Sequence, residues 1–96
     1  MKEKGGKSME NFKINLTERN KEHLALAALG FSNEEIGKYL FSSKGTVKKT
    51  LAVIFAKLKV KDRTSAVSKS WEQDILNREY IKEIIAKYSI KQPVDE

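Results

Sequence analysis

Ser42–Arg63, with the sequence SSKGTVKKTLAVIFAKLKVKDR, combines a helical apolar pattern with a concentration of positive charge. Its apolar residues recur at intervals of three and four: Val47, Leu51, Ile54 and Leu58. This spacing is typical of one buried face of an α-helix. The same stretch holds seven Lys/Arg and one Asp, so its net charge of +6 equals that of the whole chain. Because the rest of the chain is neutral, the excess is local and indicates an anionic partner.

The helix expected within this stretch presents a second, very different face. Winding residues 45–59 at 100° per residue places Gly45, Lys49, Ala52 and Ala56 opposite the apolar seam, with Lys48 beside them. Small residues and lysines form a narrow, positive ridge that suits the major groove of DNA. A solvated lysine-rich face is the alternative, but such faces usually alternate Lys with Glu. From Lys44 to Lys61 the chain has no acidic residue, which favours the DNA interpretation.

The length and composition of the chain exclude several classes of protein. Ninety-six residues suit one compact domain. With no cysteine and one histidine, His23, neither a disulfide framework nor an ordinary zinc site is expected, and we expect His23 to pack in the first helix. No catalytic triad, phosphate loop or metal-ligand spacing occurs, so we expect neither an enzyme nor a cofactor. We also expect no membrane contact and a cytoplasmic location, because a secretory signal and a long apolar span are both missing.

Cap residues predict an all-α chain. We expect a first helix at 18–29 after Thr17, although Asn20 leaves its capping box incomplete. The residues SNEE (32–35) form a full capping box for a second helix, and a third follows from about 44 to 59. Asp62 can cap a fourth helix, and the amphipathic segment 78–88 either continues it or forms a fifth. The short connection at 41–43 favours a helix-turn-helix, with an ordinary helical bundle as the alternative.

Several separate pieces of the sequence, with their spacing, resemble one known family. The patterns LT-R, G-SN-EI---L, GTVK and I--KL-V--R--AV occur in order between residues 16 and 67. Together they resemble the LuxR/GerE-type helix-turn-helix DNA-binding domain. The resemblance implies a four-helix domain at 16–76, whose third helix enters the major groove, between a flexible segment at 1–15 and a C-terminal helical extension at 77–96. It leaves open a stand-alone regulator, a fragment, or a protein that receives its signal through a partner.

The resemblance also implies a set of contact residues. Base contacts fall on Val47, Lys48, Lys49 and Ala52. Phosphate contacts fall on one row along the third helix, Thr46, Thr50 and Lys57, and on the start of the second helix, Ser32 and Asn33. We expect a further phosphate contact from Lys44, on the other flank of the third helix. Dimer contacts are expected on the fourth helix: Val67, Ser70 and Trp71. The extension goes beyond the family's usual end, and we expect Ile81 and Ile85 there to extend the dimer interface; folding back onto the core and contact with another protein are the alternatives. The chain has Gly37 and Ser42 where the family usually has alanine and an apolar residue, and we expect this to thin the core at the turn.

The most concrete interpretation is therefore a sequence-specific transcriptional regulator that binds double-stranded DNA as a homodimer, with RNA polymerase or a partner regulator as a further candidate partner. One alternative is a protein-binding adaptor that docks on another regulator through its C-terminal helices. Another is a sigma-factor-like helix-turn-helix, against which the KL-V--R--AV pattern argues.

Overall fold

A computed structural model describes residues 14–91, and within that range every regular element is helical. The expected flexible segment at 1–15 and the end of the extension lie mostly outside the described residues. The helices are α2 (Glu18–Ala28), α3 (Asn33–Leu40), α4 (Lys44–Leu58), α5 (Arg63–Glu72) and α6 (Arg78–Lys87). The all-α prediction is confirmed, and the extension forms a separate fifth helix.

Each helix starts with a side chain that caps its first turn. In every case the cap oxygen accepts a hydrogen bond from the backbone N–H three residues later; the caps are Thr17, Ser32, Ser43, Asp62 and Asn77. This is the local signal that fixes where each helix begins. The first box is complete, contrary to expectation, because the amide oxygen of Asn20 accepts from the Thr17 N–H at 3.2 Å. Asn20 therefore accepts the hydrogen bond that a glutamate side chain accepts in the usual capping box.

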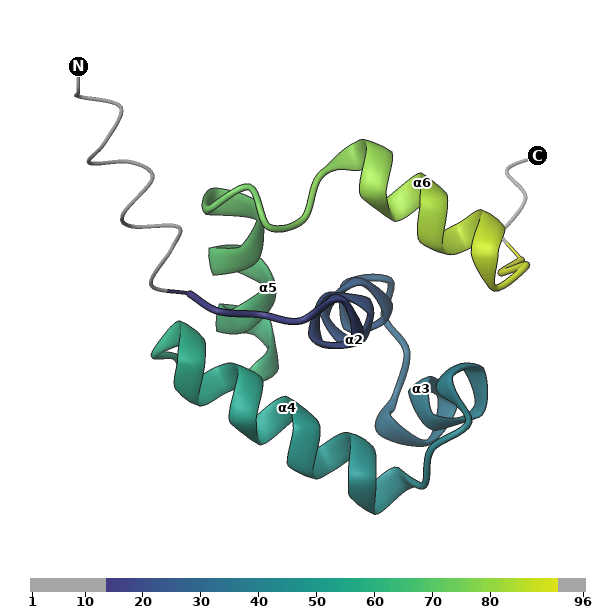
Figure 1. Cartoon of the computed structure of the whole chain (residues 1–96), viewed down its shortest axis with the longest axis horizontal. Coiled ribbons are helices and arrows are strands. Elements are labelled where there is room, and N and C mark those ends of the chain that lie inside the picture. Colours follow the sequence, from purple (N-terminus) through teal and green to yellow (C-terminus); the bar gives the residue numbers. More distant parts are fainter. Residues whose placement is uncertain (1–13, 92–96) are drawn as a thin grey trace.

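Helix α2 is the centre of the fold. Figure 1 shows it nearly end-on, with α4 along the lower side of the molecule, α6 along the upper side, and α3 and α5 on either flank. It contacts each of these four helices. The core around it is formed by buried leucines and isoleucines from α2, α3, α4, α6 and the connection after α5, among them Leu24, Leu26, Ile36, Ile54 and Leu76; α5 adds Ala66. Because α2 is surrounded, its buried residues are not confined to one face, and they include Glu22 and His23.

The turn between α3 and α4 depends on a very close approach. A methyl group at Gly37 would overlap the backbone carbonyl of Ser42, so only glycine fits there. Phe41 ends α3 in the left-handed conformation, at φ 56° and ψ 47°. A guanidinium N–H of Arg19 donates to the Leu40 carbonyl at 2.6 Å, so this carbonyl at the C-terminal end of α3 has a hydrogen-bond partner. Gly37 therefore makes the tight turn possible and does not merely thin the core.

The C-terminal extension folds back across α2. After α5 the chain reverses in a turn in which the N–H groups of Ile75 and Leu76 both donate to the Ser70 carbonyl, at 2.8 and 3.0 Å. Leu76, Ile84 and Ile90 are buried, and α6 packs against α2. None of the described helices is long and apolar enough to cross a membrane.

Candidate nucleic-acid interface

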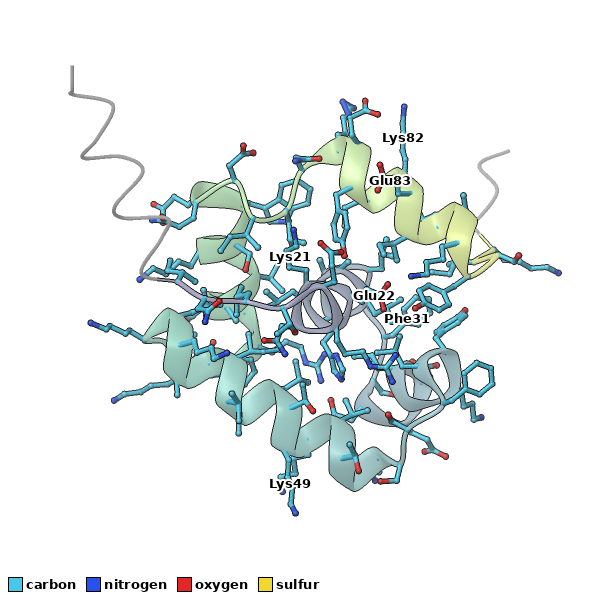
Figure 2. All side chains as sticks on the ribbon, in the orientation of Figure 1. Lys21, Glu22, Phe31, Lys49, Lys82 and Glu83 are labelled. Carbon is cyan, nitrogen blue, oxygen red and sulfur yellow. The ribbon has the colours of Figure 1, made fainter. Side chains whose placement is uncertain are left out.

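Helix α4 divides into a buried face and an exposed face. Val47, Leu51, Ile54 and Leu58 are at most 3% exposed, as their spacing predicted. The opposite side is exposed and consists of Gly45, Lys48, Lys49, Ala52 and Ala56. Figure 2 shows Lys49 pointing straight away from the body of the protein, on the outer side of α4. One helix thus anchors itself and presents a narrow positive ridge.

Val47 does not belong to that ridge. Its side chain is fully buried in the core, so it has no surface with which to contact a base. The family position that suggested a contact at Val47 lies on the apolar seam in this chain. We therefore remove Val47 from the base-contacting set and keep Lys48, Lys49 and Ala52, which are all exposed.

The charge of the ridge is not neutralised within the described part of the chain. The ion pairs found there join Lys21 to Glu18 and Lys87 to Glu22, and neither involves α4. The first turn of α4 has no acidic residue that would offset the positive end of its helix dipole. The lysines of α4 are thus free to attract an external anion.

One edge of α4 carries the hydroxyl and ammonium groups expected to contact phosphates. The Ser43 hydroxyl donates to the Thr46 hydroxyl at 3.0 Å, which fixes the Thr46 side chain at the start of the helix. Thr50 is half-buried one turn later, whereas Lys44 and Lys57 are exposed. The Lys57 ammonium donates to the Asn15 carbonyl at 2.8 Å, so the segment before α2 holds it in place.

The start of α3 supplies a second group of predicted phosphate contacts. The Ser32 hydroxyl accepts from the Glu35 N–H, and the Ser32 N–H donates to the Glu35 carboxylate at 2.8 Å. The hydrogen bond that the Ser32 N–H donates to the carboxylate lowers the pKa of Glu35. The amide oxygen of Asn33 accepts from the guanidinium of Arg63 at 2.5 Å. The capping box is confirmed, while the contacts of Ser32 and Asn33 with DNA stay a prediction.

Arg63 is a member of this surface that sequence reasoning did not identify. One guanidinium nitrogen donates to the Phe31 carbonyl at 3.1 Å and the other to Asn33, and so α5 is tied to the loop before α3. Asn33, Lys48, Ala52 and Arg63 line the same hollow beside α4. Phe31 and Asn33 lie 32 and 30 residues before Arg63 in the sequence, so no local pattern reveals these contacts.

The residues predicted for dimerisation fall into two groups. Trp71 is 45% exposed on α5, and Val67 is half-buried one turn before it. Ser70 is fully buried, and its hydroxyl donates to the Ala66 carbonyl at 2.7 Å, so it cannot contact a partner. Ile81 and Ile85 are partly buried and pack against the core. The prediction for Ser70 is corrected, and only Val67 and Trp71 remain available on α5.

His23 is 2% exposed in the middle of α2, and its Nδ1 lies 2.8 Å from the Arg19 carbonyl oxygen. Burial lowers its pKa, which keeps the imidazole neutral. It therefore packs in the first helix, as expected. Among the described residues no group of His, Cys, Asp or Glu is placed to hold a metal ion.

Comparison with known proteins adds to this geometry. Residues 14–70 match the GerE family, described as bacterial regulatory proteins of the luxR family. The CsgBAC operon transcriptional regulatory protein of Escherichia coli K12 is 49% identical over 63 residues, which cover 66% of this chain and 28% of that protein. The transcriptional regulatory protein LnrK of Bacillus subtilis is 45% identical over 53 residues, 55% of this chain and 24% of that protein. No solved structure matched the chain.

A third relative is the response regulator protein VraR of Staphylococcus aureus, 41% identical over 61 residues, which cover 64% of this chain and 29% of VraR. The matched part of the chain thus spans about a quarter of the length of these relatives. The similarity covers α2 to α5, and the family match ends before α6.

Proposed function

Because the chain belongs to the luxR family of bacterial regulatory proteins, we propose that it is a transcriptional regulator that binds double-stranded DNA as a dimer. In this proposal α4 enters the major groove, where Lys48, Lys49 and Ala52 face the bases. Ser32, Asn33, Lys44, Thr46, Thr50 and Lys57 contact the flanking phosphates. Two copies joined through Val67 and Trp71 on α5 bind half-sites about one helical turn apart.

The observation that carries the proposal is the contrast between the two faces of α4. Its apolar side is at most 3% exposed, which fixes the helix on the core, while Lys48 and Lys49 are exposed and have no acidic partner in the described residues. A helix held in this way keeps its lysines at a constant position relative to the duplex. Preorganisation of this kind is needed for base reading, whereas mobile lysines supply only non-specific attraction.

The test is a selection of bound sequences from random DNA, followed by affinity measurements at several salt concentrations. If each protomer neutralises about four phosphates, the log–log slope for the dimer is about −7. The matched variants are Lys48→Ala on α4 and Lys82→Ala on α6, which remove the same charge from two helices on opposite sides of the molecule (Figure 1). We expect Lys48→Ala to weaken binding and flatten the slope, and Lys82→Ala to change neither. Equal effects of the two variants, or no enriched sequence, would refute the proposal.

The adaptor alternative receives less support from the packing of α6. Docking through this helix requires an apolar face that is free, but Ile84 is buried and Ile81 and Ile85 pack against the core. We therefore propose that any contact with RNA polymerase or a partner regulator uses another surface. Deleting residues 77–96 is not a clean test of the adaptor function, because it would also uncover the core around Leu76 and α2.

A further inference from the structure

A half-open hollow of about 280 Å³ lies where the start of α3, the exposed flank of α4 and the first residue of α5 meet. Its apolar lining comes from Leu51, Ala52 and Phe55, and its polar lining from Asn33, Lys48 and Arg63. Ala52 is exposed, Phe55 is half-buried and Leu51 belongs to the core. The hollow is therefore an apolar recess beside the ridge of α4.

The polar side of this hollow is positively charged, and hydrogen bonds hold its Arg63 side chain in position. Arg63 donates to two neutral acceptors, the Phe31 carbonyl and the Asn33 amide oxygen, so its position is fixed, and no carboxylate between residues 14 and 91 pairs with it. Lys48 adds a second positive charge, and no acidic residue lines the hollow. The occupant that fits this chemistry is an apolar group carried on an anionic polymer.

We propose that the hollow receives the C5-methyl group of a thymine in the bound DNA. This inference rests on the proposed function and names one specificity element within it. The thymine methyl is the apolar group that base pairs present in the major groove. Ala52 offers a methyl group and no hydrogen-bonding atom, so it selects by apolar contact alone. Because Lys48 and Ala52 line both the hollow and the exposed face of α4, a duplex seated on α4 brings a base edge to the hollow.

The proposal requires a T·A pair at one fixed position in each half-site. The occupant's methyl group lies against Ala52 and Phe55, while Lys48 faces the neighbouring bases and Arg63 faces the phosphates of the same strand. An apolar segment of an acidic protein would also match the charge of the hollow. Such a segment, however, would have to compete with DNA for Lys48, and the exposed face of α4 favours DNA.

The experiment uses the full chain and the DNA site obtained by selection. Each thymine is replaced in turn by deoxyuridine, which removes only the C5-methyl group. Burial of one methyl-sized group predicts a loss of about fourfold in affinity at a single position per half-site. The other thymines serve as internal controls and should change the affinity little. No protein variant is needed for this step, so its outcome does not depend on the folding of a mutant.

Assignment of the effect to this hollow uses Ala52→Gln and its control Ala86→Gln. Glutamine is a good helix former, and at position 52 it fills the recess. The control makes the same substitution at an exposed position of α6, a helix that has no contact with α4 within the described residues. We expect Ala52→Gln to abolish the thymine-to-deoxyuridine difference at that one position, and Ala86→Gln to retain it. Circular dichroism melting curves check that both variants are folded.

The possible failures can be told apart. If no DNA sequence is enriched, the proposed function fails. If a site is enriched but no deoxyuridine weakens binding, no thymine methyl group fills the hollow and the inference alone is overturned. If a thymine effect is found and survives in Ala52→Gln, the methyl group is recognised elsewhere, and the inference is again overturned.

Discussion

The hydroxyl of Tyr88 donates a 2.8 Å hydrogen bond to Glu22, and this contact joins α2 to the residue that follows α6 across 66 positions of sequence. The Lys87 ammonium donates to the other carboxylate oxygen of Glu22 at 2.5 Å. Glu22 is only 6% exposed, and the Tyr88 ring packs edge-on against Tyr39 at 6.1 Å. This cluster fastens the extension to the family domain.

Loss of one hydrogen bond in the cluster should lower the free energy of unfolding. Tyr88→Phe removes only the hydroxyl, and we expect a decrease of about 1 kcal/mol. Glu22→Ala leaves two donors without their acceptor, and we expect about 1–3 kcal/mol. Urea unfolding followed by circular dichroism measures both. Glu83→Ala, at an exposed position of α6, is the control and should change the free energy of unfolding by no more than about 0.5 kcal/mol.

Acid should weaken the cluster. Burial raises the pKa of Glu22, but hydrogen bonds from Lys87 and Tyr88 and the Lys87 charge outweigh it, so the pKa lies below its ordinary value. A carboxyl with a depressed folded-state pKa stabilises the protein above its unfolded-state pKa, and this contribution is lost as the pH falls through the folded-state pKa. We expect Glu22→Gln to reduce the dependence of unfolding free energy on acidic pH. The Ser65 N–H lowers the pKa of Asp62 as well, so Asp62→Asn should remove a separate part of the acid dependence and leave the Glu22 contribution in place.

Alanine should have opposite effects at two glycines of the helix-turn-helix. At Gly37 the added methyl group meets the Ser42 carbonyl, and overpacking against backbone predicts a loss of about 1–3 kcal/mol. At Gly45 the nearest atom to an added methyl is the Ser43 hydroxyl at 3.9 Å, and helix propensity predicts a gain of up to about 1 kcal/mol. Thermal unfolding of both variants checks this, and a loss at each would contradict it.

Replacement of Lys49 should weaken sequence-specific DNA binding more than non-specific DNA binding. Lys49 points outward from the middle of the ridge, so we expect Lys49→Ala to weaken binding to the selected site more than binding to random DNA (Figure 2). Titrations with both DNAs at one salt concentration measure the ratio. Equal losses on the two DNAs would show that Lys49 contacts only phosphate.

A charge at Trp71 should separate the proposed dimer. Trp71 is 45% exposed beside Val67, and a buried carboxylate at a subunit contact would be unfavourable. We expect Trp71→Glu to sediment as a monomer and to bind the two-half-site DNA more weakly. Ser65→Glu adds the same charge at an exposed position near the start of α5 and should leave the association unchanged. A wild-type protein that is already monomeric on DNA would contradict the dimer.

The sequence predicted the helices well, because their start signals are local. Ser32, Ser43 and Asp62 each act through a backbone N–H three residues away, so the boundaries of α3, α4 and α5 follow from the sequence. The path of α6 was not predictable in this way. It depends on the contact between Glu22 and Tyr88, which have no relationship in the linear sequence.

The candidate site shows the same division. Helical periodicity correctly separated the lysines of α4 from its apolar seam. Transfer of positions from a family pattern was less exact, since Val47 and Ser70 are fully buried in this chain. The role of Arg63 depends on Phe31 and Asn33, and only the folded chain brings these three residues together.

The placement of α6 has a consequence for how such a protein changes over time. Within residues 14–91, α6 packs on α2 and has no contact with α4 (Figure 1). Substitutions in α6 can therefore adjust the temperature at which the chain unfolds and leave the exposed face of α4 untouched. Under the proposed function, heat tolerance and gene choice are traits that selection can tune separately.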